Sequence, residues 1–177
     1  MTSLLIKNAR IASEDNDDLL PADVLVENGI ITKIGNDIEA ESATRVIDGS
    51  GKILSPAMFD THIHMREPGQ EAKETIKTGT EAAINGGVTG VVLMPNTSPA
   101  IDSAAMVRTI YEIAERDSRI PVYTSGCITK GREGKELAGI DGMLQLGVKM
   151  LTDDGDAVPD MMLLKRAMEY ASEFDCF

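Results

Sequence analysis

The sequence predicts an α/β protein in which a small β segment precedes a series of β/α units. Residues 1–55 alternate short apolar runs with turn signals, whereas from Pro56 onward β-like runs alternate with helical ones. The later strands are too apolar to face water, which indicates a parallel sheet covered by helices. We therefore expect two domains in these 177 residues, at 1–55 and 56–177.

The first segment is expected to form antiparallel β structure. Apolar runs occur at 4–6, 23–26, 30–34 and 45–47, with a last one at 51–54. Asn28-Gly29 stands between two of these runs and is a strong signal for a tight hairpin. Asp48-Gly49 marks a further turn.

Four β/α units are expected after Pro56. The predicted strands are 57–63, 88–94, 120–125 and 148–152, and the predicted helices are 72–85, 102–116, 136–146 and 159–174. Residues 175–177 begin a fifth strand. Gly86-Gly87 ends the first helix, and Pro159 suits the first turn of the last. A doubly wound sheet and an eight-stranded barrel both agree with this order.

Charge and cysteine content narrow the class of protein. Seventeen basic and 29 acidic residues give a net charge of -12, which disfavours nucleic acid and anionic membranes as partners. The first twenty residues include four acidic ones and no unbroken apolar stretch, so we expect no signal peptide or membrane span. Cys127 and Cys176 are far apart in the sequence and show no paired spacing. This fits a reducing compartment better than a disulfide framework. We expect a cytoplasmic protein.

The only two histidines, His62 and His64, stand at the end of the first predicted strand of the β/α region. A period of two places both imidazoles on one face of a strand. Active sites of parallel α/β folds lie at the carboxyl ends of the strands, so the pair is a candidate for metal ligation. A catalytic zinc usually has three protein ligands, so another must come from elsewhere.

Carboxylates follow the fourth predicted strand, in Thr152-Asp153-Asp154-Gly155. Successive side chains alternate, so at most one of Asp153 and Asp154 points toward the histidines. Both could equally be ordinary loop or capping residues. A calcium loop starting at Asp154 is disfavoured, because Lys165 takes the position of its last carboxylate.

Two more polar residues follow strands at the same edge. Arg66 could hold a substrate carboxylate through its planar fork, and Asn96 is placed similarly after the second strand. The stretch 131–135, Gly-Arg-Glu-Gly-Lys, superficially suggests a phosphate loop. Glu136 stands where such a loop needs Ser or Thr, so we discard that interpretation.

These motifs together resemble the dihydroorotases, which are cyclic amidohydrolases of the amidohydrolase superfamily. Residues 59–69, Phe-Asp-Thr-His-Ile-His-Met-Arg-Glu-Pro-Gly, resemble their metal-binding signature. Blocks at 86–89, 94–97, 128–131 and 151–155 follow in the family's order. The resemblance covers the whole chain and implies the N-terminal portion of the family fold. That portion is about the first half of a TIM-type (β/α)8 barrel, preceded by part of a small β-sandwich.

The resemblance also implies roles for particular residues. His62, His64 and Asp154 correspond to metal ligands for one or two zinc ions, with Asp154 as the bridging carboxylate. Arg66 and Asn96 correspond to the residues that hold the substrate carboxylate. Lys149 comes too early in its strand to be the carboxylated lysine of related enzymes.

Family members are much longer than this chain. By resemblance, further metal-binding histidines and the general acid/base aspartate lie beyond Phe177, so we assign no catalytic residue within the chain. We expect the sequence to be the front part of a longer protein, and this chain alone to be inactive.

The implied reaction is the reversible, metal-dependent cyclisation of N-carbamoyl-L-aspartate to L-dihydroorotate in pyrimidine biosynthesis. One alternative is a related cyclic amidohydrolase, either dihydropyrimidinase or allantoinase. Another is a non-catalytic dihydroorotase-like partner of aspartate transcarbamoylase. The expected partners are the small-molecule substrate and either a second copy of the chain or aspartate transcarbamoylase.

Overall fold

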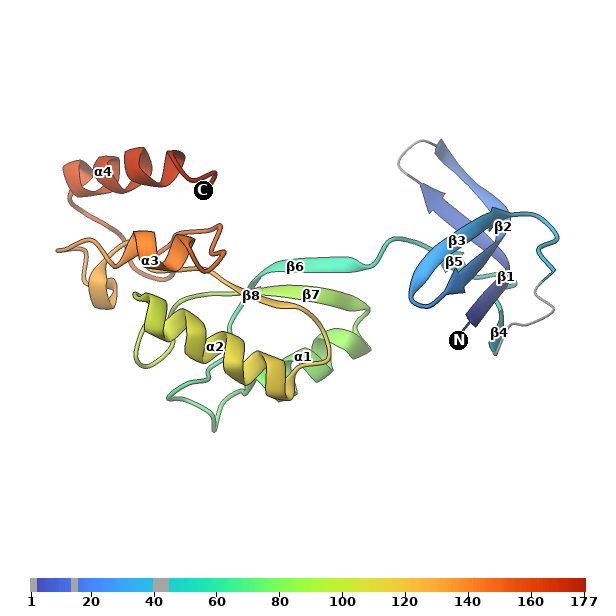
Figure 1. Ribbon diagram of the computed structural model, residues 1–177, viewed down its shortest axis with the longest axis horizontal. Helices are drawn as coiled ribbons and strands as arrows, with labels where there is room; N and C mark the ends of the chain where they lie inside the picture. Colours follow the sequence, from blue (N-terminus) through green and yellow to red (C-terminus); the bar gives the residue numbers. More distant parts are fainter. Residues whose placement is uncertain (1–2, 14–15, 40–44) are drawn as a thin grey trace. The chain divides into compact units, whose positions relative to one another are not determined.

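A computed structural model describes residues 3–13, 16–39 and 45–177 (Figure 1). Contacts within the chain divide it into two compact units, Met1–Pro56 and Ala57–Phe177. Each unit contains its own sheet. Within the described ranges, no helix is both long and apolar enough to cross a membrane.

The first unit holds a five-stranded sheet. Its strands are β1 (Ser3–Ser13), β2 (Asn16–Glu27), β3 (Ile30–Gly35), β4 (Arg45–Asp48) and β5 (Ile53–Leu54). They lie in the order β3-β2-β1-β4, and β5 also pairs with β1. The predicted hairpin at Asn28-Gly29 is confirmed, because both residues have positive φ between the antiparallel strands β2 and β3.

The expectation of a wholly antiparallel segment is wrong. Strands β4 and β5 both pair with β1 in parallel. The connection from Gly35 to Arg45 is too long for a tight hairpin, and it brings β4 to the other side of β1 from β2.

The first unit has a small set of buried apolar side chains. They are Leu5, Ala9, Val24 and Ile38. The buried carboxylate of Asp23 accepts hydrogen bonds from the backbone nitrogens of Asn8 and Ile38, at 2.8 and 3.0 Å. Other large apolar side chains of the unit are exposed, among them Ile30, Ile31, Ile34, Val46 and Ile53. The described residues of this unit form one sheet, and the β-sandwich stays a prediction.

The second unit contains a parallel sheet in consecutive order. Its strands are β6 (Met58–Ile63), β7 (Val88–Leu93) and β8 (Val122–Thr124). β6 pairs with β7 and β7 with β8, each in parallel. These three strands match three of the strands predicted from the sequence, although β8 is shorter.

The fourth predicted strand is reduced to a single parallel bridge. Gly126 donates to the oxygen of Met150 at 2.9 Å and accepts from Thr152 at 2.9 Å, which forms an isolated bridge to Leu151. The prediction of a full strand over 148–152 is wrong. β8 ends at Thr124, so it provides too short an edge for a longer strand to pair with.

The end of the chain lies against this bridge. Phe177 donates to the oxygen of Lys149 at 3.1 Å and accepts from Leu151 at 2.8 Å. This alternation is the hydrogen-bond pattern of a parallel ladder. It occurs where the sequence predicts a fifth strand to begin.

Four α-helices and one short 3-10 helix complete the unit. They are α1 (Ile76–Asn85), α2 (Ala104–Asp117), η1 (Lys130–Arg132), α3 (Ile140–Leu144) and α4 (Met161–Ser172). α1 begins later than predicted because Thr75 and Thr78 form a capping box. α4 begins after Asp160, whose carboxylate caps the nitrogens of Met162 and Leu163, so Pro159 precedes the helix.

The predicted helix 136–146 is wrong over its first turn. Lys130 donates to the oxygen of Glu136 at 2.9 Å, and Ala138 donates to the oxygen of Ile128 at 3.0 Å. These antiparallel contacts hold residues 136–138 extended, so the helix is limited to Ile140–Leu144.

The core of the second unit lies against one face of its sheet. Val91, Leu93 and Val122 from the strands pack with buried residues of the helices. The helical members of this core are Ile76, Val107, Ile110, Ala114, Ile140, Met143 and Ala167. Phe59 and Tyr123 are about half exposed, at 51% and 48%, with their rings 5.8 Å apart. The described residues form an open α/β sheet and no closed barrel.

Candidate metal centre

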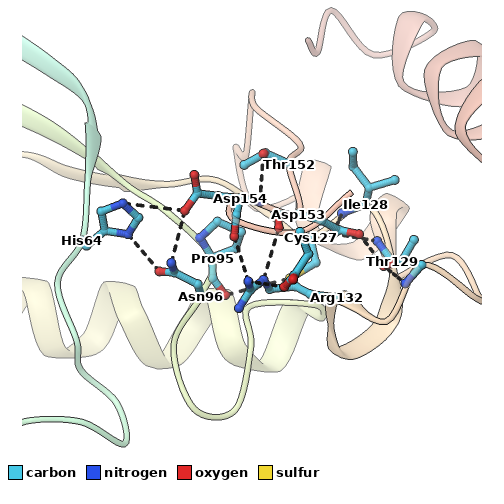
Figure 2. A network of polar contacts seen from close by, with 12 residues as sticks. His64, Pro95, Asn96, Cys127, Ile128, Thr129, Arg132, Thr152, Asp153 and Asp154 are labelled. Atoms are coloured by element: carbon cyan, nitrogen blue, oxygen red, sulfur yellow. Dashed lines mark hydrogen bonds and ion pairs between the residues drawn. The ribbon is translucent and has the colours of Figure 1, made fainter. Parts of the chain in front are cut away.

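The candidate residues follow the carboxyl ends of neighbouring parallel strands. His62 lies in the last part of β6 and His64 just beyond it, while Asn96 follows β7. Asp154 follows the bridge at Leu151. Loops at this edge of a parallel sheet meet in space, which explains how side chains from distant parts of the sequence converge. Figure 2 shows His64, Asn96 and Asp154 pointing toward one another.

The carboxylate of Asp154 lies between the two imidazoles. Its Oδ1 is 3.2 Å from Nε2 of His62, and its Oδ2 is 3.6 Å from Nε2 of His64. The two rings are 5.2 Å apart in an edge-on arrangement. One donor atom from each of the three residues lies within 4.8 Å of the other two.

This donor group fits a zinc ion. Donor atoms held about 2.1 Å from a tetrahedral ion lie roughly 3.4 Å apart, which is close to the separations between Asp154 and the imidazoles. Two imidazole nitrogens and one carboxylate oxygen are ordinary zinc ligands. The side chains of His62, His64 and Asp154 are 57%, 32% and 17% exposed, so a small molecule can approach the group.

Asn96 connects two members of the donor group. Its Nδ2 donates to Oδ2 of Asp154 at 3.1 Å, and its Oδ1 lies 3.0 Å from Nδ1 of His64. A carboxylate can only accept, so the amide nitrogen must face Asp154 and the amide oxygen must face His64. Nδ1 of His64 then carries the hydrogen, which leaves the lone pair of Nε2 directed into the donor group.

Arg66 lies on the loop after β6. Among the described residues, the structure records no hydrogen bond or ion pair to its partly buried guanidinium. The loop itself is tightly held, because Gly69 has a φ of 95° and a Cβ there would lie 2.0 Å from the oxygen of Ser98. The assignment of Arg66 to a substrate carboxylate stays a prediction.

Asp153 and Asp154 have different surroundings. Asp154 faces the histidines, whereas Asp153 is 3% exposed and accepts from the nitrogens of Ile128 and Thr129 at 2.9 and 3.0 Å. Lys149 makes its hydrogen bonds elsewhere, because its amine donates to the backbone oxygens of residues 174 and 175.

Sequence reasoning missed the role of Arg132 in this region. Its guanidinium donates to the carbonyl oxygens of Asp153 and Asp154, at 3.3 and 2.8 Å. The nearby glycines, Gly131 and Gly134, have positive φ and do mark a tight loop. Nothing in the local pattern could indicate which distant backbone the loop contacts.

Cys127 is a buried free thiol near Asp153. Burial is the main cause that raises the pKa of Cys127, and the nearby charge of Asp153 raises it further. Its Sγ is 4.0 Å from the oxygen of Pro95. Metal ligation requires a thiolate, so this side chain is an apolar filler at neutral pH.

Residues 51–177 match the family described as dihydro-orotase-like. The chain belongs to this family. It is 44% identical over 174 residues to dihydroorotase from Sulfurihydrogenibium sp. (strain YO3AOP1), which is 98% of the chain and 41% of that relative. It is 42% identical over 172 residues to dihydroorotase from Acetivibrio thermocellus, with coverages of 97% and 40%. The chain thus spans about two fifths of the length of the curated relatives it matches.

Solved structures of cyclic amidohydrolases have the same fold as this dihydro-orotase-like chain. A D-hydantoinase matches with a TM-score of 0.77 at 23% identity, over 99% of the chain and 39% of its own length. A D-hydantoinase (dihydropyrimidinase) from Thermus sp. matches with a TM-score of 0.72 at 28% identity, over 96% and 38%. The chain is therefore an α/β fragment that corresponds to the N-terminal part of these proteins.

Proposed function

We propose that the complete protein is a zinc-dependent dihydroorotase that reversibly closes N-carbamoyl-L-aspartate to L-dihydroorotate. The observation that carries this proposal is the donor group of His62, His64 and Asp154, whose ligand atoms lie within 4.8 Å of one another. It occurs in a chain whose curated relatives, at 40–44% identity, are named dihydroorotase.

The proposed fold of the complete protein is a (β/α)8 barrel flanked by a small β-sandwich. The consecutive order of β6, β7 and β8 supports the barrel, since a doubly wound sheet reverses its strand order at a switch point. The single core supports it as well, because helices cover only the outer face of barrel strands. Phe59 and Tyr123 would then belong to the barrel interior.

In the proposed site, His62, His64 and Asp154 would hold zinc through two imidazole nitrogens and a carboxylate. Zinc, when bound, supplies a Lewis acid that polarises a carbonyl group and makes water more acidic. The side-chain oxygen of Asn96 favours the tautomer of neutral His64 that carries its hydrogen on Nδ1, and its nitrogen directs the carboxylate of Asp154. The general acid/base is expected from an aspartate beyond Phe177.

Arg66 decides the proposed substrate. Arg66 lies on the loop after β6, two residues beyond His64, and its planar fork suits the carboxylate of N-carbamoyl-L-aspartate. The rival substrates, dihydropyrimidines and allantoin, carry no such carboxylate. The likeness to hydantoinases supports the rival, but those proteins are 22–28% identical to the chain, well below the dihydroorotases.

The test uses the complete gene product, purified with zinc. The protein is expected to close N-carbamoyl-L-aspartate to L-dihydroorotate. It is expected not to hydrolyse 5,6-dihydrouracil or allantoin. Removal of metal by a chelator should abolish turnover, and added zinc should restore it. Turnover of dihydrouracil or allantoin alone would replace the proposal with the sibling enzyme. A folded but inert protein that co-purifies with aspartate transcarbamoylase would replace it with the non-catalytic partner.

A further inference from the structure

The stretch 131–135, which lacks the pattern of a phosphate loop, contacts the turn that carries Asp154. The guanidinium of Arg132 donates to the carbonyl oxygens of two successive residues, Asp153 and Asp154, and forms an ion pair with Asp156. The Arg132 side chain is 19% exposed, so its hydrogen bonds to the two carbonyl oxygens are partly shielded from solvent, whereas Asp156 is 55% exposed. One planar group therefore fixes three successive parts of the turn.

The turn holds the loop in return. The carboxylate of Asp153 accepts from the nitrogens of Ile128 and Thr129, and from the hydroxyl group of Thr129. The same hydroxyl oxygen accepts from the nitrogen of Gly134 at 2.9 Å. Each segment thus satisfies buried polar groups of the other, and the two form one closed network (Figure 2).

Arg132 adopts a backbone conformation that non-glycine residues avoid, with a φ of 62°. Such a conformation costs conformational energy and persists only where surrounding contacts determine it. Here the contacts are those of its own guanidinium with the turn after Thr152. The strained residue and the candidate ligand Asp154 are therefore parts of one arrangement.

We propose that Arg132 is a positioning residue that directs the carboxylate of Asp154 toward the two histidines. It touches no metal donor atom and acts through the backbone of Asp153 and Asp154. The inference rests on the proposed metal centre and assigns it a residue outside the ligand set. Arginine suits this role better than lysine, because its planar fork can donate to two carbonyl oxygens at once.

The test titrates the full 177-residue chain with Co²⁺, followed by visible absorption, at a temperature where circular dichroism shows each variant to be folded. Loss of an outer partner of a metal ligand typically weakens affinity by about 10–100-fold. Arg132→Ala is expected to fall in that range, and Arg132→Lys to lie between it and wild type. Lys135→Ala is the matched control, because Lys135 is exposed and, in the part of the chain that the structure describes, pairs only with Glu133.

A double-mutant cycle separates positioning from general stabilisation. In an Asp154→Ala background, Arg132→Ala should change Co²⁺ affinity less than twofold, whereas in a His62→Ala background it should keep its full effect. An equal effect in both backgrounds would overturn the proposal. So would wild-type affinity in Arg132→Ala or, if that variant does not fold, in Arg132→Lys. Failure of the wild-type chain to bind Co²⁺ would overturn the metal centre itself, and this role with it.

Discussion

Asn96 donates from its side-chain nitrogen to Oδ2 of Asp154 at 3.1 Å, and its oxygen lies 3.0 Å from Nδ1 of His64. One amide therefore orients two candidate ligands. We expect Asn96→Ala to weaken Co²⁺ binding about tenfold, because both ligands lose their outer partner. Asn85→Ala is the control, since the side chain of Asn85 donates to the backbone of its own helix, away from the donor group. Equal affinities for the two variants would contradict this role.

The same relationship predicts the tautomer of His64. Nitrogen-detected NMR of the neutral imidazole should show the hydrogen on Nδ1 in the wild-type chain, because the oxygen of Asn96 accepts it. In Asn96→Ala the two tautomers should mix. A wild-type His64 with its hydrogen on Nε2 would rule out the proposed orientation of the Asn96 amide.

Asp153 and Asp154 should respond in opposite ways to substitution. Asp154→Ala is expected to weaken metal binding strongly, to the level that the two histidines alone retain, while the free energy of unfolding of the metal-free chain changes little, since its carboxylate faces the donor group. Asp153→Ala should lower that free energy by about 3 kcal/mol, because it leaves buried backbone donors of Ile128 and Thr129 unpaired. Metal analysis and urea unfolding measure the two effects. The reverse pattern would exchange the roles of the two aspartates.

Arg66→Lys is expected to raise the KM of the complete enzyme for N-carbamoyl-L-aspartate about tenfold, because a point charge replaces a planar fork. Steady-state kinetics of ring closure measure this change. Arg108→Lys, on the exposed side of α2, should leave the kinetics as in wild type. If Arg66→Lys matched it, Arg66 would not hold the substrate carboxylate.

The burial of the Cys127 thiol predicts that the free energy of unfolding decreases at alkaline pH. Its pKa is raised above the ordinary value of 9.0 by burial, so the folded chain keeps a proton that the unfolded chain releases. The stabilisation is complete below pH 9.0 and decreases as pH rises above it toward the folded-state pKa. Urea unfolding between pH 8 and 10 should be less pH-dependent in Cys127→Ala. A slope identical to that of wild type would show that other groups control this range.

The 177-residue chain alone is expected to show no ring closure, even with zinc, because the family's general acid/base is expected beyond Phe177. It should nevertheless bind Co²⁺ through the donor group. The exposed face around Phe59 and Tyr123 should favour self-association, which size-exclusion chromatography measures. Turnover close to that of full-length enzymes would place the acid/base within residues 1–177.

Local patterns in the sequence were sufficient for features that depend on neighbouring residues. Asn28-Gly29 gave the hairpin, and alternating apolar runs gave β6, β7 and β8. The pattern at 136–146 predicted a helix, but backbone contacts with 128–130 hold its first residues extended. Long-range hydrogen bonds override local preference there, and no periodicity encodes them.

The role of Arg132 could not be predicted for the same reason. Its partners Asp153 and Asp154 are distant in sequence, and only the folded chain brings them together. The two histidines were recognisable as a pair because they stand two residues apart at the end of one predicted strand. The contact of both with Asp154, and the link through Asn96, required the strand order.

The donor group is divided by the sheet itself: His62 and His64 come before β7, and Asp154 comes after β8. An unfolded chain can present the histidine pair but not the third donor beside it. An ion that binds the native chain at 100 times its Kd would stabilise that chain by about 2.7 kcal/mol. Metal supply would then govern the folded fraction of the protein, so that starvation for zinc would lead to proteolysis as well as to loss of turnover.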